Sequence, residues 1–388
     1  MLPYILTFTA SYLLAVVGLR IKRIRPFFYK ALIAMAILLP SFLAGFRDSG
    51  VGTDMMVYGD KYFAYAKNIS MAKFFAITGC EYGYGAFVYL VAYFTDKIFW
   101  MYFLTELIII SLVWKSFDEY INDRFKPFAL LIYYFMFYSF SLNLMRQSIA
   151  MSILLYSFRF IRNQKKIPFL LCCVLAFLFH KTSIVGLTIY PIYQVCVTDN
   201  KGEYKQTNKL KHKAKRVELK HLIKKYRFII IFFGIVIAIL VVKNAKAIIA
   251  MLYLYFNDYH SIYYGLKGSG TSTIVYTSYM LLLLLFTSYG IDHRKTCFLF
   301  YFLMFAMNII MYQLKHVSNA AYRISLYFSF FLVILLPKVI QETKSPRNRM
   351  FNMYVSFALI NIYAYDYFVI RLYNETYPYT SKLLGIRG

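Results

Sequence analysis

The chain has 388 residues, 60% of them hydrophobic and only 16% charged, with a mean hydropathy of +0.54. Because a soluble globular domain carries about 25% charged residues, this composition excludes an ordinary water-soluble protein. The formal net charge of +27 could indicate nucleic-acid binding, but the clustering of the charges in alternate loops favours a membrane protein without a nucleic-acid partner.

Long apolar runs follow one another along the whole chain. A helix that crosses the hydrocarbon core of a bilayer needs about 20 mostly apolar residues. We therefore predict an all-α fold in which residues 1–388 form a single polytopic membrane domain with about 10 to 12 transmembrane helices. The candidate spans are 2–19, 27–46, 84–95, 98–114, 128–143, 144–160, 167–190, 228–250, 273–290, 297–314, 324–340 and 350–370.

Some of these boundaries stay open. The regions 84–114 and 128–160 are each too long for one spanning helix and short for two. Short spans, kinked helices and re-entrant segments would all fit them. The first run, 2–19, is predicted to be a retained helix rather than a signal peptide, because its basic residues follow it instead of preceding it.

The basic residues are clustered in alternate loops. Residues 20–30 hold five Lys or Arg and no acid, and residues 197–227 hold eleven against three acids. Cytoplasmic loops of membrane proteins carry such an excess. The predicted topology therefore places 20–26 and the basic loop 197–227 in the cytoplasm, where anionic lipid headgroups would attract them, and the loops 47–83 and 115–127 outside.

One basic group disagrees with this topology. The residues at 159–166 would face outward if 128–143 and 144–160 both cross the membrane. They would face the cytoplasm if 167–190 does not span, or if it dips into the membrane and returns near Lys181. The sequence leaves both alternatives open.

Signatures of cofactor chemistry are missing from the sequence. The five cysteines show no metal-ligand spacing, and the chain contains neither a P-loop nor a GxGxxG motif. We predict that the protein uses no metal and no cofactor.

The candidate functional residues are polar groups inside or beside apolar stretches, because such groups are costly unless they are paired or hydrated. In GFRDSGVGTDMMVYGD, residues 45–60, the charged Arg47, Asp48 and Asp54 crowd beside the membrane, and Glu81 in CEYGYG could complete the set. A carboxylate there could take a proton or bind a hydroxyl while Arg47 binds an anion. A solvated surface ion pair is the alternative.

Three further segments hold polar side chains within apolar runs. Arg146 and Gln147 lie in LNLMRQSIAMSILLYSF, where Arg146 would suit a bidentate grip on phosphate or carboxylate, or would be a snorkelling interfacial residue. His180, in LAFLFHKTSIVGLTIYP, is suited to proton exchange near neutral pH, although buried histidines are often purely structural. His316 and Arg323 stand at the predicted outer face, where Arg323 could also be a plain anchor.

Taken together, three of these segments resemble a known family. GFRDSGVGTDMMVY is similar to its "FR…vGtD…Y" motif, and the block from MRQSIAMS to FHKTS is similar to its "RQ…A…fHkts" block. YRISLYFSFFLVILLPKV is similar to its late "R…yF…iP" helix. The family is EpsG, Wzy-like polymerases of exopolysaccharide and capsule, and the resemblance covers most of the chain in order.

The resemblance implies a multi-pass glycosyltransferase of the bacterial cytoplasmic (inner) membrane. Such an enzyme joins oligosaccharide repeat units carried on undecaprenyl diphosphate into exopolysaccharide or capsule on the outer side. Its partners would be the lipid-linked donor and acceptor, membrane lipids, a flippase and a chain-length regulator. No nucleotide is required, because the donor carries its own leaving group.

The implied reaction suggests roles for the candidate residues. His180, Asp54 or Glu81 would take the proton of the acceptor hydroxyl, or His180 would donate a hydrogen bond to the leaving diphosphate. The predicted substrate-binding residues, whose arginines would bind the diphosphates, are Arg47, Asp48, Arg146, Gln147, His316 and Arg323.

Two other classes stay open from the sequence. A transporter or flippase of lipid-linked sugars would show paired halves with matching interrupted helices, and no such symmetry is visible. A membrane O-acyltransferase that modifies glycans would also use a histidine with acidic partners.

Overall fold

The computed structural model describes residues 1–197, 270–291, 295–316 and 319–387. Within these ranges every regular element is a helix, and the only β pairing is an isolated bridge between Ser381 and Ile386. The predicted all-α fold is therefore confirmed. The predicted span at 228–250 and all but the first residue of the basic loop 197–227 lie outside the described residues.

Six helical segments of the described chain are long and apolar enough to cross a membrane, so the chain is a multi-pass membrane protein. They are Leu2–Ile21, Pro26–Phe46, Phe99–Phe117, Thr296–Gln313, Asn319–Gln341 and Pro346–Ile370. Two shorter apolar helices, Lys166–Phe179 and Ile274–Thr287, accompany them.

The chain falls into two compact units. The first comprises Met1–Gly186, Leu281–Ile291 and Phe330–Gly388, and the second comprises Leu187–Met280 and Asp292–Ser329. This division does not test whether the chain folds as one polytopic domain, which stays a prediction.

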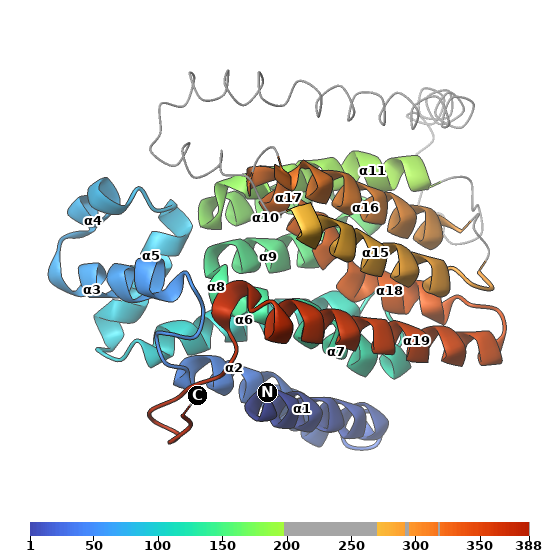
Figure 1. Cartoon of the computed structure of the whole chain (residues 1–388), viewed down its shortest axis with the longest axis horizontal. Helices are drawn as coiled ribbons and strands as arrows, with labels where there is room; N and C mark the ends of the chain where they lie inside the picture. The colour runs from blue at the N-terminus through green and yellow to red at the C-terminus, as the bar shows by residue number, and fades with distance from the viewer. Residues whose placement is uncertain (198–269, 292–294, 317–318, 388) are drawn as a thin grey trace. The chain divides into compact units, whose positions relative to one another are not determined.

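The described elements, coloured along the chain in Figure 1, are α1 (Leu2–Ile21), α2 (Pro26–Phe46), η1 (Met55–Gly59), α3 (Asp60–Asn68), α4 (Met71–Thr78), α5 (Tyr82–Phe94), α6 (Phe99–Phe117), η2 (Asp123–Phe125), α7 (Lys126–Met136), α8 (Tyr138–Asn143), α9 (Met145–Arg162), α10 (Lys166–Phe179), η3 (Lys181–Thr188), α11 (Ile189–Cys196), α15 (Gly270–Thr287), α16 (Thr296–Gln313), η4 (Leu314–His316), α17 (Asn319–Phe330), α18 (Leu332–Gln341), α19 (Pro346–Ala364), η5 (Tyr365–Ile370) and η6 (Tyr373–Glu375).

Helix α18 lies in the interior of the first unit, where it packs against α7. Its residues Leu332, Val333, Ile334, Leu335 and Leu336 are all buried. A helix that is apolar on every side is expected to be buried in this way. The surface that would face lipid is left to helices such as α1 and α10, which expose many apolar side chains.

The short helix α5 does not cross a membrane. It has 13 residues, and the long helices before and after it, α2 and α6, meet at the same end. The next helix, α6, begins beside the end of α2, since the ring of Phe99 lies 4.8 Å from that of Phe46 and the ring of Phe103 lies 4.8 Å from that of Phe42. Figure 1 shows α3, α4 and α5 grouped at this end of the first unit's long helices. The predicted crossing at 84–95 is therefore wrong, and α6 runs antiparallel to α2.

The loop 115–127 therefore lies at the opposite end of the first unit from the loop 47–83. The Nζ of Lys22 lies 2.8 Å from Oδ2 of Asp123, and the N–H of Asn122 donates to the side chain of Gln341 at 2.9 Å. The predicted topology placed 115–127 at the same end as 47–83, and these contacts contradict it. We call the end that holds 20–25, 115–127 and 341–349 the basic end, and the other end of the first unit the site end.

Because α5 does not cross, the basic residues at 159–166 no longer disagree with the topology that the other basic loops indicate. Glu119 forms an ion pair with Arg159 and accepts a hydrogen bond from Asn163 at 2.9 Å. The turn between α9 and α10 therefore lies at the basic end with the other clusters. Positive charge is concentrated at one end of the first unit, as the positive-inside rule requires of a cytoplasmic face.

The stretch predicted as a span at 167–190 is not one straight helix. Helix α10 ends at Phe179, and His180 is extended, with φ −159° and ψ 120°. The chain then continues as the 3₁₀ helix η3. This break puts His180 at the end of a helix rather than in the middle of one.

The second unit packs around a buried asparagine. Asn308 on α16 accepts a hydrogen bond from the hydroxyl of Tyr276 at 2.9 Å and donates to the carbonyl of Ser325 at 3.0 Å. The ring of Tyr193 on α11 meets that of Phe300 on α16 edge-on, with centroids 5.3 Å apart. Buried polar groups in lipid need such partners, and this network satisfies them within the unit.

The corrected topology can be tested by labelling engineered thiols in intact cells. Asn122→Cys should react from the same side of the membrane as Arg23→Cys, and from the opposite side to Gly50→Cys, all three positions being exposed. Wild-type protein, with its five native cysteines, gives the background. Reaction of Asn122→Cys from the side of Gly50→Cys would restore the topology that the sequence predicts.

Candidate functional site

Three sequence segments meet at the carboxylate of Glu81. The Nη1 of Arg146 lies 2.6 Å from Oε2 of Glu81, and the Nδ1 of His180 lies 2.9 Å from Oε1. The side chains are largely buried, with exposed fractions of 8% for Glu81, 18% for Arg146 and 5% for His180. We call these three residues the Glu81 cluster.

The hairpin of α9 and α10 explains why Arg146 and His180 lie together. A short turn joins the two helices and they pack against each other. At about 1.5 Å per residue, Arg146 lies about 24 Å from Arg162 along α9, and His180 lies about 21 Å from Lys166 along α10. The two residues therefore reach the same end of the hairpin, opposite the basic turn.

A glycine allows Glu81 to approach them. Gly83, in the first turn of α5, packs so closely on the end of α10 that a Cβ atom there would lie 2.8 Å from the carbonyl oxygen of Leu178. Real Cβ atoms essentially never come this close to backbone atoms. Only glycine at this position lets α5 bring Glu81 into contact with the residue that follows α10.

The charge state of Glu81 is set by its neighbours. Burial opposes ionisation, but the hydrogen bond from His180 and the positive charge of Arg146 outweigh it and hold the pKa of Glu81 well below its usual range. Glu81 is thus an anion at neutral pH and a weak proton acceptor. Because a carboxylate only accepts hydrogen bonds, Nδ1 of His180 is the donor, and this fixes the orientation of the ring.

Arg47 lies nearby with a different set of neighbours. Its side chain is buried, its Nη2 lies 2.9 Å from Sδ of Met55 and 3.6 Å from Sδ of Met145, and its guanidinium lies 4.4 Å from the ring centre of Tyr102. In the described part of the chain its Nε and Nη1 have no hydrogen-bond partner, and no carboxylate forms an ion pair with it. A buried cation in such surroundings carries a large desolvation penalty, which an anionic ligand would offset.

Tyrosines surround Arg146 and were not singled out by the sequence. The guanidinium carbon of Arg146 lies 4.9 Å from the ring centre of Tyr58 and 6.0 Å from those of Tyr62 and Tyr84. The i,i+4 spacing of Tyr58 and Tyr62 was the available signal, but in a chain with 39 tyrosines it does not stand out. Aromatic faces attract a guanidinium through cation–π contacts, so these rings stabilise the positive charge of Arg146, and ring faces can also stack against a ligand.

The loop that comes after Arg47 is held by the C-terminal tail. Gly52, at φ +109°, donates its N–H to the carbonyl of Glu375 at 3.0 Å. Asp48 donates its N–H to the carbonyl of Thr380 at 3.1 Å, and its carboxylate accepts from the N–H of Lys382 at 3.0 Å. The carboxylate of Asp48 therefore anchors the tail.

Asp54 is positioned by a residue from the α8–α9 corner. The N–H of Asp54 donates to Oδ1 of Asn143 at 2.7 Å, and the hydroxyl of Thr53 donates to the same oxygen at 3.0 Å. Asn143 was not predicted, because nothing in the sequence connects it with a loop about 90 residues away. Asp54 is partly exposed, whereas Gln147, on α9 beside Arg146, is buried.

The structure thus brings Arg47, Glu81, Arg146 and His180 to the site end of the first unit. Arg323 lies on α17 in the second unit. His316 ends η4 in that unit, and its side chain lies outside the described residues. Both stay predictions. Among the described residues no group of three or more His, Cys, Asp or Glu side chains could hold a metal ion.

The comparison with protein families gives one match. A model described as the EpsG family matches residues 30–203 and 216–381, which is most of the chain and includes every residue of the Glu81 cluster. Neither the curated proteins nor the solved structures contain a significant match.

The Glu81 cluster can be tested as a buried ion pair. Glu81→Gln should lower the free energy of unfolding by about 3 to 5 kcal/mol, because it leaves the charge of Arg146 without its carboxylate. The matched control is Asp96→Asn, which removes the exposed partner of Lys67 and should cost less than about 1 kcal/mol. Thermal unfolding of both variants in detergent measures the difference. Equal midpoints would show that Glu81 is not the partner of Arg146.

Proposed function

Because the chain belongs to the EpsG family, we propose that it polymerises lipid-linked oligosaccharide repeat units into exopolysaccharide or capsule. Family membership supports an exopolysaccharide polymerase-type role. The observation that carries the proposal is the Glu81 cluster with Arg47 beside it. It combines an oriented histidine, a fixed carboxylate and two arginines at one end of a membrane protein.

The reaction needs one proton acceptor and one anion site. The acceptor hydroxyl of one repeat unit attacks the anomeric carbon of the glycan on the other carrier, forming a new C–O bond. The bond between that carbon and the diphosphate breaks, and the lipid diphosphate leaves with the electron pair. The hydroxyl proton passes to a base.

We assign the base role to His180. Its Nδ1 is bound by Glu81, so Nε2 is the nitrogen that would take the proton. Glu81, with its lowered pKa, is too weak a base at neutral pH and acts as a positioning residue that also stabilises the imidazolium. Asp54 is the remaining carboxylate candidate for the same role.

The arginines supply the anion site. Arg146 already shares its charge with Glu81, whereas Arg47 has no carboxylate partner among the described residues and would bind the departing diphosphate most strongly. Guanidinium groups bind phosphate oxygens in a bidentate manner, and donors held in place beforehand stabilise charge that develops in the transition state. Arg323 and His316 remain proposed ligands of the second carrier.

The basic end indicates how the protein is oriented in the membrane. If the positive-inside rule holds, the basic end faces the cytoplasm and the site end opens to the outer side of the bacterial cytoplasmic membrane. The proposed substrates are undecaprenyl diphosphate-linked donor and acceptor, which a flippase would have to deliver there. A chain-length regulator is a further proposed partner. The tyrosines around Arg146 would offer stacking faces to the sugars.

Substitution of His180 tests the proposed base. His180→Ala should reduce polymer formation by about 100-fold or more at normal protein levels, because positioned bases contribute about that much. His180→Gln should fail as well, since an amide can donate a hydrogen bond but cannot take the proton. Lys181→Gln is the matched control, an exposed neighbour whose loss should leave chain length unchanged. The measurement is the length distribution of surface glycan.

The glycan that accumulates when the protein is lost also distinguishes a polymerase from a flippase and from an O-acyltransferase. Loss of a polymerase leaves single repeat units at the cell surface, and loss of a flippase leaves them inside. Loss of an O-acyltransferase leaves full-length chains without acyl groups. Near-normal chain lengths from His180→Gln would exclude the base role and leave Asp54 as the better candidate.

A further inference from the structure

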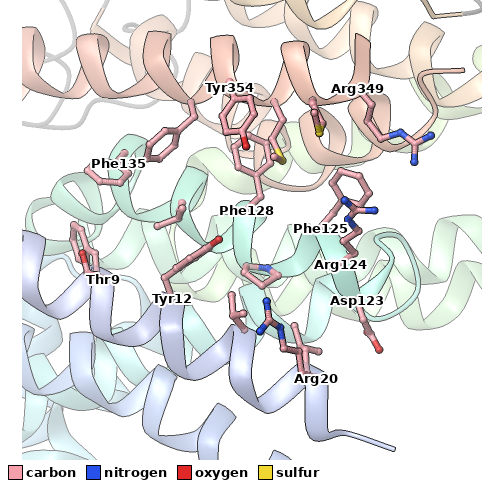
Figure 2. A pocket seen from close by; sticks show the side chains of 18 of the residues that line it. Thr9, Tyr12, Arg20, Asp123, Arg124, Phe125, Phe128, Phe135, Arg349 and Tyr354 are labelled. Carbon is pink, nitrogen blue, oxygen red and sulfur yellow. The ribbon is translucent and has the colours of Figure 1, made fainter. Parts of the chain in front are cut away.

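A crevice of about 700 Å³ lies on the first unit, away from the Glu81 cluster. Figure 2 shows it between α1, the segment η2–α7 and α19. Its volume falls in the range of small-molecule sites, roughly 300 to 1,000 Å³. None of its lining residues belongs to the proposed reaction.

The crevice is long and mostly apolar. Along α1 its lining runs from Ile5 to Arg20, about 22 Å at about 1.5 Å per residue. Phe8, Phe128 and Phe357 are among the rings that line it. One leaflet of a bilayer has a hydrocarbon depth of about 15 Å, so the crevice is long enough for an acyl chain that lies along the helices.

Its lining is open to the surroundings. The side chains of Ile5, Met350 and Tyr354 are 47%, 51% and 64% exposed. In a multi-pass membrane protein these side chains would contact lipid rather than water. The natural occupant of such a groove is therefore an apolar chain.

Three arginines gather at one end of this crevice. Arg20, Arg124 and Arg349 all line it, and Figure 2 shows them at the same end as Asp123. Asp123 is already paired, with Lys22 at 2.8 Å and Lys126 at 2.7 Å.

No carboxylate of the described chain forms an ion pair with the three arginines. The Nε atom of Arg349 is buried without a hydrogen-bond partner among the described residues. Asp123, the acidic residue that lines this end, pairs with lysines, so the three arginines have no ion-pair partner among the described residues.

We propose that the crevice binds an anionic phospholipid, whose phosphate is held by Arg20, Arg124 and Arg349 and whose acyl chain lies between α1, α7 and α19. Guanidinium groups bind phosphate oxygens in bidentate geometry. Basic pockets between transmembrane helices on the cytoplasmic side are suited to anionic headgroups, and the arginines lie at the basic end. The proposal does not depend on the proposed polymerase activity, because the crevice and the Glu81 cluster lie at different places on the unit.

Charge and shape together favour this occupant. A zwitterionic lipid would bring a cationic headgroup toward three arginines that have no acidic partner among the described residues. A polyprenyl diphosphate carrier would be required at the site end, where the proposed reaction takes place. The crevice instead places its anion site at the opposite end.

The test uses the purified full-length protein and measures binding of phosphatidylglycerol and phosphatidylcholine by native mass spectrometry. The triple variant Arg20→Gln, Arg124→Gln, Arg349→Gln should bind phosphatidylglycerol at least about tenfold more weakly, since a basic residue near an anionic lipid contributes about a fivefold factor. The charge-matched control is Arg23→Gln, Arg25→Gln, Lys30→Gln, which removes exposed cations that do not line the crevice and should weaken binding much less, because only diffuse attraction is lost.

A second variant tests the acyl-chain position without altering charge. Thr9 lines the crevice and is exposed, so Thr9→Trp should fill it and weaken phosphatidylglycerol binding even if the triple variant fails to fold. Equal losses in the two triple variants would overturn the proposal in favour of diffuse attraction. Unchanged binding by Thr9→Trp, equal binding of phosphatidylcholine, or stronger binding of a polyprenyl phosphate would overturn it too.

Discussion

The carboxylate of Glu81 is the constraint on which the candidate site depends. A buried guanidinium and a buried imidazole both need an anionic or accepting partner, and Glu81 gives one oxygen to each. The arrangement works only because the α9–α10 hairpin returns to its starting end and because Gly83 lets α5 approach the backbone of α10. Arg47 forms no ion pair with a carboxylate among the described residues. It remains a buried cation between two methionines and a tyrosine ring, which is a costly arrangement unless an anion binds there.

Charge has different roles at the two ends of the first unit. At the basic end, the pairs of Lys22 with Asp123 and of Arg159 with Glu119 lie at the surface and contribute little to stability, whereas Lys126 is buried between Asp118 and Asp123. At the site end, Arg47, Glu81 and His180 are buried, and the neighbours of Glu81 hold its pKa below the usual range. The net charge of +27 therefore reflects mainly the basic clusters of the sequence, and it says little about the Glu81 cluster.

Much of the site could be predicted from the sequence, since Arg146 and His180 are polar residues in long apolar runs and Arg47 and Glu81 adjoin such runs. Their contacts could not be predicted, because residues about 65 and 99 positions apart meet only through tertiary packing. The same limit applies to Asn143 and to the C-terminal tail, whose backbone hydrogen bonds hold the loop after Arg47. The tyrosines were missed because they are common in this chain.

The fold class was predictable from hydropathy, but the topology between 84 and 127 was not. A window average does not separate the 13-residue helix α5 from a true span, and one false crossing reverses the side of every later loop. The predicted conflict at 159–166 was the sign of that error. Once 115–127 is placed beside 20–25 by the ion pair of Lys22 and Asp123, the basic clusters of the first unit agree with one another.

The central claim is that the buried cation of Arg47, unlike the paired charges of the Glu81 cluster, serves a ligand and not the fold, and Arg47→Met tests it most directly. Methionine fits a site already lined by Met55 and Met145, so removal of the buried cation should leave the thermal unfolding midpoint unchanged or higher. Polymer formation should fall by about 100-fold or more, because a donor aimed at developing charge is lost. A variant that unfolds at lower temperature but makes normal polymer would contradict the account.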